Sequence, residues 1–322
     1  MKNYVSIDIG GTAIKYGLIR EDGRILSRNI MDTEAEKGGA GILEKVQNVI
    51  AEFHTQEEIS GICISTAGVV DTNRGIITYS APLIPDYAGT EYKKILEGRF
   101  HIPCEVENDV NCAGLAEYYS GAAAGSKISL MLTVGTGIGG SIVINGEIFR
   151  GVSGSACEVG YMNMQGGDFQ TLGAASILSQ KVAEWKSEPK EMWNGYRIFE
   201  AAKKGDALCV RAIDEMTDIL GQGIANICCV LNPEIVVLGG GIMAQEDFLR
   251  ERMDLSVGRY LIPELARHTK LAFAKHGNDA GMLGAFYHFQ LRRFGPAALQ
   301  QLEGVISPVF PRLPSGIEEG VS

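Results

Sequence analysis

Two similar stretches, far apart in the sequence, constrain what this chain can fold into. Residues 4–19 read YVSIDIGGTAIKYGLI, and residues 130–144 read LMLTVGTGIGGSIVI. In each, an apolar β-rich run enters a Gly/Thr turn, leaves it as a second β-rich run, and ends at a polar turn with Gly23 or Gly146. The pattern predicts two matching β-hairpins, one at the head of each half of the chain.

The glycines of both turns, at residues 10–12 and 135–140, leave backbone N–H groups open to an anion. Concave turns of this kind bind phosphate groups. A matched pair of them indicates two half-molecules with a polyanionic ligand between them, as in a nucleotide-using enzyme. The alternative, that the glycines serve only to make tight turns, is equally good for one such turn taken alone.

Residues 135–140 also satisfy G-x-G-x-x-G, the dinucleotide fingerprint. That fingerprint requires a helix after the glycines, so that the pyrophosphate lies on the helix N-terminus. Here the β-branched run 141–144 follows, and Asn145-Gly146 is typical of a hairpin turn. The sequence therefore predicts a strand at this point and argues against a dinucleotide-binding fold.

The composition excludes several classes of protein. With 322 residues, 45% of them hydrophobic and 21% charged, the chain can form two globular domains. A net charge of −10 argues against a nucleic-acid partner. The seven cysteines show no metal-ligand spacing and predict buried thiols in a reducing compartment. With no signal peptide or membrane-length apolar run, we expect a cytoplasmic protein with no membrane partner.

Periodicity along the chain predicts a series of α/β elements. In the first half we expect a strand at 24–27, an amphipathic helix around 42–53, a strand at 61–65, a small-residue loop at 66–71, an irregular stretch at 82–87, a helix at 91–100, a strand at 104–106 and a helix at 112–120. In the second half we expect a glycine-rich loop at 151–160, a glycine-rich segment at 165–168, a helix from about 174 to 185, a helix at 208–231, a strand at 234–238, a helix at 280–293 and a tail from 296.

Four polar residues follow the predicted strand at 104–106: Glu107, Asn108, Asp109 and Asn111. Polar side chains at the carboxyl end of a strand are where open α/β sheets bind ligands. Asn108 could instead cap the next helix, with Asp109 in its first turn. A cap needs one such residue rather than three, so the cluster favours a ligand site.

A third glycine turn, Gly239-Gly240-Gly241, follows the predicted strand at 234–238. Taken alone, it fits a plain strand-to-helix turn as well as a nucleotide contact.

In their order, these motifs resemble the ROK family, which groups bacterial sugar kinases with transcriptional repressors. The motifs are Asp8-x-Gly-Gly-Thr12, Glu107-Asn-Asp-Val-Asn111, Gly135-Thr-Gly-x-Gly-Gly140, Glu158-x-Gly160 and Gly239-Gly-Gly241. The resemblance implies an α/β fold of the actin/hexokinase/ribonuclease H-like type: two related lobes on five-stranded sheets, with ATP and sugar in the interdomain cleft. The lobes would be residues 1–116, joined by a C-terminal helix at about 280–294, and residues 117–279, with 295–322 as a tail.

The resemblance implies ATP-dependent phosphorylation of a sugar hydroxyl, with the 6-hydroxyl expected. Asp109 would be the general base, and Asp8 would act near Mg²⁺ through water. The ATP-binding residues implied are Gly10, Gly11, Thr12, Gly135, Thr136, Gly137 and Gly139 at the phosphates, and Gly239, Gly240 and Gly241 facing the adenosine. The sugar-binding residues implied are Gly68, Asn108, Asp109, Glu158 and Tyr161.

Two departures from the family pattern bear on the substrate. Most members have a zinc-binding His where Tyr161 stands, and no cysteine lies between Cys157 and Cys209, so no structural zinc is expected. The family's second sugar-contacting Glu is also missing, because Asp168 is the only acid in residues 165–176. Short zinc-free members with Glu-x-Gly-Tyr-Met resemble bacterial β-glucoside kinases, whose substrates carry a substituent at the anomeric carbon. A β-glucoside is therefore the leading substrate hypothesis.

Other members of the family leave alternatives open. A glucokinase and an N-acetylmannosamine kinase are alternatives within the kinases, and a non-catalytic sugar-sensing regulator is the alternative outside them. ROK repressors carry a winged helix-turn-helix before the first hairpin, whereas this chain starts at the hairpin and is acidic. The family is commonly dimeric, so we expect a homodimer.

Overall fold

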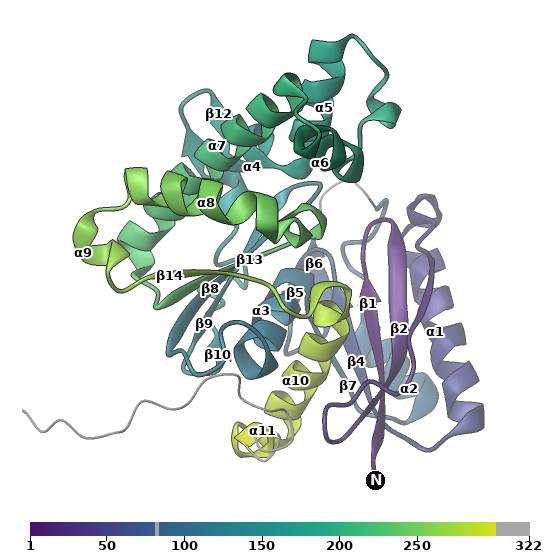
Figure 1. Ribbon diagram of the computed structural model, residues 1–322. Helices are drawn as coiled ribbons and strands as arrows, with labels where there is room; N and C mark the ends of the chain where they lie inside the picture. Colours follow the sequence, from purple (N-terminus) through teal and green to yellow (C-terminus); the bar gives the residue numbers. More distant parts are fainter. Residues whose placement is uncertain (81–83, 301–322) are drawn as a thin grey trace, which may run out of the picture.

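Two five-stranded sheets organise the computed structural model, which describes residues 1–80 and 84–300. Their strand orders are β3-β2-β1-β4-β7 and β10-β9-β8-β13-β14 (Figure 1). In each sheet, three antiparallel strands are followed by two parallel ones. The two halves thus share one topology, which confirms the repeat predicted from the hairpins.

The first sheet carries the N-terminal hairpin. Its strands are β1 (Asn3–Ile9), β2 (Ala13–Arg20), β3 (Asn29–Asp32), β4 (Ile59–Thr66) and β7 (Cys104–Asn108). Helix α1 (Gly38–Gln56) buries Ile42, Val46 and Ile50 against this sheet, as its spacing predicts, and α2 (Tyr92–Phe100) packs beside β7. A short hairpin, β5 (Val69–Asp71) and β6 (Ile76–Tyr79), follows β4.

The second sheet carries the second hairpin and more helices. Its strands are β8 (Ile128–Val134), β9 (Ile138–Ile144), β10 (Glu147–Ile148), β13 (Ile235–Gly239) and β14 (Lys270–Phe273). Its helices are α4 (Phe169–Gly173), α5 (Ala175–Lys186), α6 (Gly195–Lys203), α7 (Ala207–Leu231), α8 (Glu246–Tyr260) and α9 (Pro263–Ala266). Two-residue strands β11 (Asn163–Met164) and β12 (Gly167–Asp168) pair before α4. Short 3₁₀ turns are η1 (Ala35–Lys37), η2 (Val159–Tyr161), η3 (Lys190–Met192), η4 (Gly241–Ala244) and η5 (Gly277–Asp279).

Helices α3 (Asp109–Ser120) and α10 (Ala280–Phe294) cross each other and pack against both sheets (Figure 1). The crossing is close, because a Cβ added at Gly284 would overlap the carbonyl oxygen of Cys112. Ser6 in β1 donates to the carbonyl of Met282 at 2.7 Å, which fixes α10 on the first sheet. On the other side, a Cβ at Gly114 would lie 2.6 Å from the Ser141 hydroxyl of β9. The exact boundaries between the two lobes stay a prediction.

Several element predictions were wrong in detail. Residues 24–27 form only a bridge from Ile25 to Ile19, and the third strand is β3 instead. The reason is local: the Ser27 hydroxyl accepts the N–H of Leu18 at 3.1 Å in place of a backbone partner. Part of the loop predicted at 66–71 is strand β5.

The helix predicted from about 174 to 185 is confirmed as α5, whereas the short helix α4 just before it was not predicted. Ala174 is extended, with ψ 156°, and this residue separates α4 from α5. Helix α3 starts at Asp109 rather than at residue 112. Residues 84–87 are irregular, as predicted, while 81–83 lie outside the described residues.

The predicted tail begins with a short helix, α11 (Ala297–Gln300), and residues 301–322 lie outside the described residues. In the part of the chain that the structure describes, no helix is both long and apolar enough to cross a membrane.

Candidate active site

The first glycine turn joins β1 to β2 at the end of the first sheet. Gly10 donates its N–H to the carbonyl of Ala13 at 3.0 Å. The hydroxyl of Thr33 donates to the Gly10 carbonyl at 2.7 Å, and the Thr33 N–H donates to Thr12 at 2.9 Å. Gly11 has no atom within 4 Å of where a Cβ would be, so its backbone is open on that side. The turn is held rigid while its outer face stays accessible.

Asp8 is the second-to-last residue of β1, just before this turn, and its side chain points between β4 and α10. The Ser65 hydroxyl donates to its Oδ1 at 2.7 Å, and the Lys15 ammonium lies 3.9 Å from its Oδ2. A Cβ added at Gly281 would overlap the carboxylate, so the second residue of α10 is a glycine where Asp8 needs room. Burial raises the pKa of Asp8, and the Ser65 hydrogen bond and the Lys15 charge oppose that rise.

Strand β7 ends in the polar cluster predicted as a ligand site. Asn108 caps α3, because its Oδ1 accepts the N–H groups of Val110 at 2.9 Å and Asn111 at 3.1 Å. Its amide donates to the Gly68 carbonyl and to Asp109 Oδ1, both at 3.0 Å. The capping role and a ligand role are therefore compatible: the cap fixes the amide that orients Asp109.

Asp109 begins helix α3 at the end of the first sheet. Burial, followed by the negative charge of Asp8, raises the pKa of Asp109 to about 6. Hydrogen bonds from the N–H of Val110, at 2.9 Å, and from the Asn108 amide oppose that rise. A carboxylate that titrates near neutral pH in a polar strand end is suited to accept a proton.

Glu107 stabilises the polar cluster through buried hydrogen bonds and an ion pair. Its carboxylate is buried and accepts Arg150 Nη2 at 2.6 Å, Asn111 Nδ2 at 3.0 Å and the N–H of Asn108 at 2.8 Å. The His288 ring lies 3.7 Å away, but burial lowers the pKa of His288 to about 4, so the ring is neutral at pH 7. Burial alone would raise the pKa of Glu107; the surrounding charges and donors outweigh it, and Arg150 supplies the positive charge near neutral pH.

The second glycine turn lies close to this cluster. A Cβ at Gly139 would be 2.6 Å from Val110 Cγ2, next to Asp109 in the chain. The Ser176 hydroxyl donates to the carbonyl of Thr136 at 2.6 Å and fixes the turn to α5. Gly135 donates within the turn to Gly137 at 2.9 Å. The turn runs into β9, which confirms that it is a hairpin and not a dinucleotide fingerprint.

The third glycine turn packs against the second. Gly240 has φ 101°, and a Cβ there would overlap the carbonyl oxygen of Val134, the last residue of β8. Only glycine fits this position without strain. Gly239 and Gly241 flank it, and η4 begins at Gly241. The structure therefore brings the second and third turns together.

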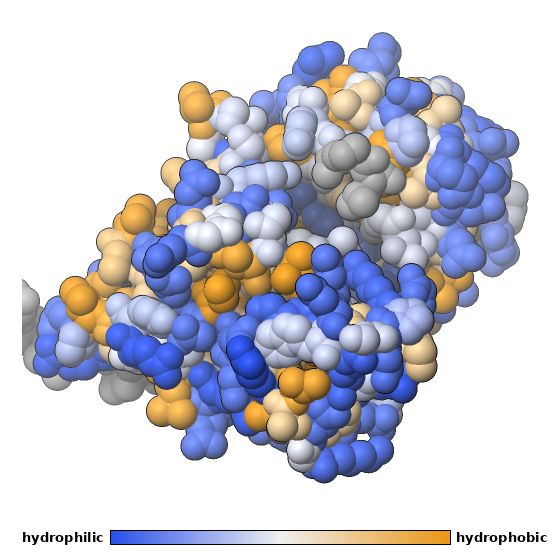
Figure 2. All heavy atoms as spheres, turned by 90° about the horizontal axis from the view of Figure 1, so that it is seen from above, coloured by the Kyte–Doolittle hydropathy of each residue, from blue (hydrophilic) through white to orange (hydrophobic). Residues whose placement is uncertain are grey.

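The predicted sugar-binding residues come from both halves. Gly68 lies between β4 and β5, with φ 97°, beside the backbone of Tyr79. Glu158 precedes η2 and is exposed, and burial of part of its side chain raises its pKa. Tyr161 ends η2 and is 52% exposed. Seen from above, the molecular surface is hollowed near the middle of the view, between two larger masses (Figure 2).

Four residues near the site were not predicted: Ser65, Tyr79, Arg150 and Gln170. Gln170 lies on α4, which was also missed, and its Oε1 is 2.7 Å from where a Cβ at Gly137 would be. It lies within residues 165–176, the segment that lacks the second acidic residue of the family pattern. Gln170 could have been recognised from the sequence as an uncharged side chain that can make hydrogen bonds like those of the missing Glu.

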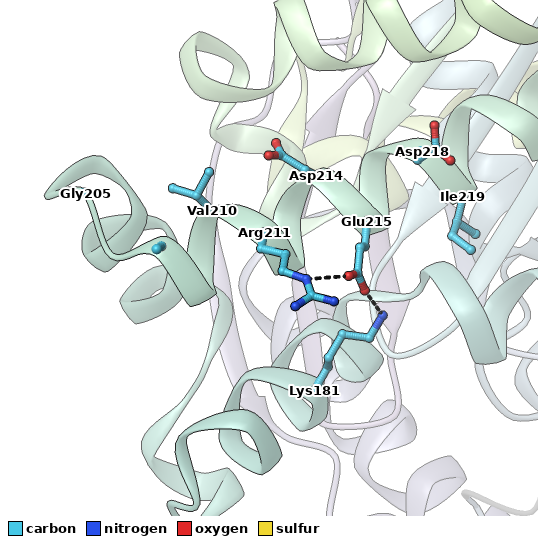
Figure 3. A pocket seen from close by; sticks show the side chains of 9 residues that line it. Lys181, Gly205, Val210, Arg211, Asp214, Glu215, Asp218 and Ile219 are labelled. Carbon is cyan, nitrogen blue, oxygen red and sulfur yellow. Dashed lines mark hydrogen bonds and ion pairs between the residues drawn. The ribbon is translucent and has the colours of Figure 1, made fainter.

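A second hollow lies away from these residues, on the outer face of α7. It is lined by Lys181, Arg211, Glu215 and their neighbours, and none of the predicted site residues is among them (Figure 3). Glu215 accepts Lys181 at 2.9 Å and Arg211 at 3.0 Å, so the charges there pair with one another. We assign no ligand to this groove.

Metal ligands are sparse in the described residues. Within residues 1–80 and 84–300, no group of three or more His, Cys, Asp or Glu side chains is arranged to hold a metal ion. The absence of zinc stays a prediction. A Mg²⁺ ion that is held mainly by water and substrate phosphates needs only one or two protein carboxylates, so Asp8 fits that ion.

Comparisons with known proteins agree with this geometry. The model of the ROK family matches residues 4–291. An uncharacterized protein from Clostridium perfringens is 48% identical over 89% of this chain and 97% of its own length. A β-glucoside kinase from Klebsiella pneumoniae is 33% identical, over 88% of this chain and 95% of its own. A glucokinase from Halalkalibacterium halodurans is 30% identical, over 87% and 93%.

Solved structures give the same result. The glucokinase from Streptomyces griseus in complex with glucose and AMPPNP aligns with a TM-score of 0.78 and 28% identity, covering 88% of this chain and 97% of that one. A ROK family protein from Streptococcus pneumoniae in complex with sucrose aligns with a TM-score of 0.80 and 28% identity, covering 90% and 98%. The predicted actin/hexokinase-type fold is therefore confirmed.

Proposed function

Because the chain belongs to the ROK family, we propose that it phosphorylates the 6-hydroxyl of a hexose or of a β-glucoside, with Asp109 as the general base. Its activity class follows from its relatives: it is an ATP-dependent carbohydrate kinase. The observation that carries the finer proposal is the position of Asp109, at a strand end beside the second glycine turn, with its pKa raised to about 6.

The proposed chemistry needs one proton acceptor. The sugar oxygen forms a bond to the γ-phosphorus, the bond from that phosphorus to the β–γ bridging oxygen breaks, and the hydroxyl proton passes to the Asp109 carboxylate. With a pKa of about 6, the carboxylate is mostly ionised at pH 7 and basic enough to take the proton. The Asn108 amide, 3.0 Å from Asp109 Oδ1, holds the carboxylate toward the substrate.

The glycine turns supply the phosphate contacts in this proposal. Backbone N–H groups of Gly10, Gly11 and Thr12 on one side, and of residues 135–139 on the other, hold the β- and γ-phosphates without side-chain bulk. Turn 239–241 faces the adenosine. Asp8 would help to hold Mg²⁺, and the ion when bound would neutralise charge that develops on the phosphates.

The substrate proposal combines two observations. The residues proposed to face the sugar, Gly68, Asn108, Glu158 and Tyr161, come from both halves, and two of the relatives are a β-glucoside kinase and a glucokinase. Residues 165–176 lack the second acidic side chain of the family pattern and contain the uncharged Gln170, which favours a substrate whose anomeric oxygen is substituted. Glucose and N-acetylmannosamine remain the alternative substrates.

Release of ADP tests the function directly. We would measure it at steady state with Mg·ATP and a panel of glucose, mannose, N-acetylmannosamine, phenyl β-D-glucoside and cellobiose, and identify the phosphorylated position by NMR. Turnover of a β-glucoside at the 6-hydroxyl supports the proposal, and turnover of a free hexose alone points to an alternative substrate. Sugar binding without ADP release would indicate a non-catalytic regulator. We further propose a cytoplasmic homodimer with no nucleic-acid or membrane partner.

A further inference from the structure

Two exposed tyrosines meet on the sugar side of the site. Tyr79 ends β6 of the first half and is 55% exposed, while Tyr161 ends η2 of the second half and is 52% exposed. Their side chains are hydrogen-bonded to each other, so the two rings approach from opposite halves of the molecule. Neighbouring aromatic side chains left open to solvent indicate a surface that a ligand covers.

Gln170 fixes the position of this pair. Its side-chain amide is hydrogen-bonded to the Tyr161 hydroxyl. Its Oε1 lies 2.7 Å from where a Cβ at Gly137 would be and 3.0 Å from the same point at Gly160. The Gln170 side chain therefore lies between the second glycine turn and the loop that carries Glu158, and it positions the Tyr161 ring.

The pair lies beside the residues that face the sugar. A Cβ at Gly68 would be 2.6 Å from the Tyr79 carbonyl, and Gly68 itself accepts the Asn108 amide at 3.0 Å. On the other side, Glu158 is close enough for its charge to act on Tyr161. Partial burial, more than this charge, raises the pKa of Tyr161, so its hydroxyl stays protonated and can donate.

We propose that Tyr79 and Tyr161 form a subsite for the ring attached to the anomeric oxygen of a β-glucoside, and that Gln170 positions it. The proposal rests on the proposed sugar kinase function and specifies how that site selects its substrate. Aromatic faces pack well against the apolar face of an aryl or pyranose ring. Tyr79, Tyr161 and Gln170 carry no charge, and Tyr161 already interacts with both of the others, so the subsite does not need a free anomeric hydroxyl to satisfy the Tyr161 hydroxyl.

The ratio of kcat/KM for phenyl β-D-glucoside to kcat/KM for glucose tests the subsite. We expect Tyr79→Ala and Tyr161→Ala each to lower this ratio by about threefold to tenfold, the value of one aromatic contact. Tyr161→Phe should keep most of the ratio, because the ring remains. Methyl β-D-glucoside, whose substituent is too small to span both rings, should show a smaller change.

Tyr260→Ala is the matched control, because Tyr260 is a partly exposed tyrosine of α8 whose hydroxyl bonds Asp218 at 2.8 Å. It should leave the ratio unchanged. A ratio that equals the wild-type value in both Tyr79→Ala and Tyr161→Ala overturns the proposal.

Binding separates this proposal from the proposed function. If the wild-type protein phosphorylates neither sugar, the kinase assignment for these substrates is wrong, and the subsite is then tested by calorimetric titration with phenyl β-D-glucoside. Binding that weakens in both alanine variants but not in Tyr260→Ala supports the subsite. Binding that is equal in all variants, or undetectable in the wild type, overturns it.

Discussion

The negative charge of Asp8 raises the pKa of Asp109, so the two carboxylates repel each other at the end of the first sheet. Asp8 comes from β1 and Asp109 from the start of α3, and burial is the larger cause of the rise. Each carboxylate also has its own hydroxyl or amide donor, Ser65 at 2.7 Å for Asp8 and Asn108 at 3.0 Å for Asp109. Their different surroundings are consistent with the two roles proposed above, Asp8 near Mg²⁺ and the phosphates and Asp109 as the base.

Replacing the proposed base should remove turnover but not the fold. We expect Asp109→Asn to lower kcat by about 10²–10⁴-fold, because the amide keeps the shape and loses the proton acceptor. Circular dichroism should be unchanged, and Asp247→Asn, an exposed carboxylate on α8, should keep wild-type turnover. Near-normal turnover of Asp109→Asn would rule out this assignment of the base.

The same substitution should change the pH dependence of stability. The pKa of Asp109 is about 6 in the folded protein and about 3.9 in an unfolded chain. The folded state thus binds the proton more tightly, and ionisation costs folding free energy as pH rises between these values. We expect Asp109→Asn to be more stable than the wild type at pH 7.5 by up to about 3 kcal/mol, with no difference below about pH 4.

Urea unfolding of both proteins at several pH values measures this difference. A gap that is constant from pH 4 to 8 would mean that Asp109 has an ordinary pKa.

The repeated hairpins were enough to predict the two related sheets, because a hairpin with a glycine turn has a strong local signal. The prediction of a strand at 24–27 was wrong because the Ser27 hydroxyl, and not a backbone carbonyl, accepts the N–H of Leu18. No local sequence pattern predicts this hydrogen bond. Gln170 and Tyr79 were missed for a different reason. Both act through contacts between segments far apart in the sequence, and neither belongs to a motif.

Replacing Arg150 alone should lower the free energy of unfolding more than replacing Glu107 alone. Arg150→Met leaves a carboxylate with 2% exposure and no cation, whereas Glu107→Gln leaves a guanidinium that is 31% exposed and can reach water. We expect Arg150→Met to cost about 2–4 kcal/mol of unfolding free energy and Glu107→Gln about 1–2 kcal/mol.

The double variant should cost less than the sum of the two single ones, because the residues contact each other. Urea unfolding at pH 7.5 gives all three values. A larger loss of unfolding free energy in Glu107→Gln than in Arg150→Met would show that Arg150 is not needed to stabilise the charged form of Glu107.

The third glycine turn offers a matched pair of substitutions. Gly240→Ala should lower stability by about 1–3 kcal/mol, because a Cβ would strain the backbone and overlap the Val134 carbonyl. Gly241→Ala, one residue on, has no atom within 4 Å of the new Cβ and should change stability by less than about 0.5 kcal/mol. Equal effects of the two, measured by thermal unfolding, would mean that the turn is not packed against β8.

The last prediction concerns closure of the site. The two phosphate turns lie on separate sheets, and the crossing helices α3 and α10 pack between those sheets, so a small rotation at the crossing would change the distance between the turns. In the proposed site, the sugar would contact both halves, through Gly68 and Asn108 on one and Glu158 on the other. Sugar bound to both halves should therefore favour a closed arrangement that brings Asp109 toward turn 135–140 and excludes water. Exclusion matters because water could otherwise take the place of the sugar hydroxyl and hydrolyse ATP. We expect slow ATP hydrolysis without sugar, and a smaller radius of gyration in solution scattering with sugar plus a non-hydrolysable ATP analogue. An unchanged scattering profile at demonstrated saturation, together with sugar-independent hydrolysis, would contradict closure and favour a rigid ATPase.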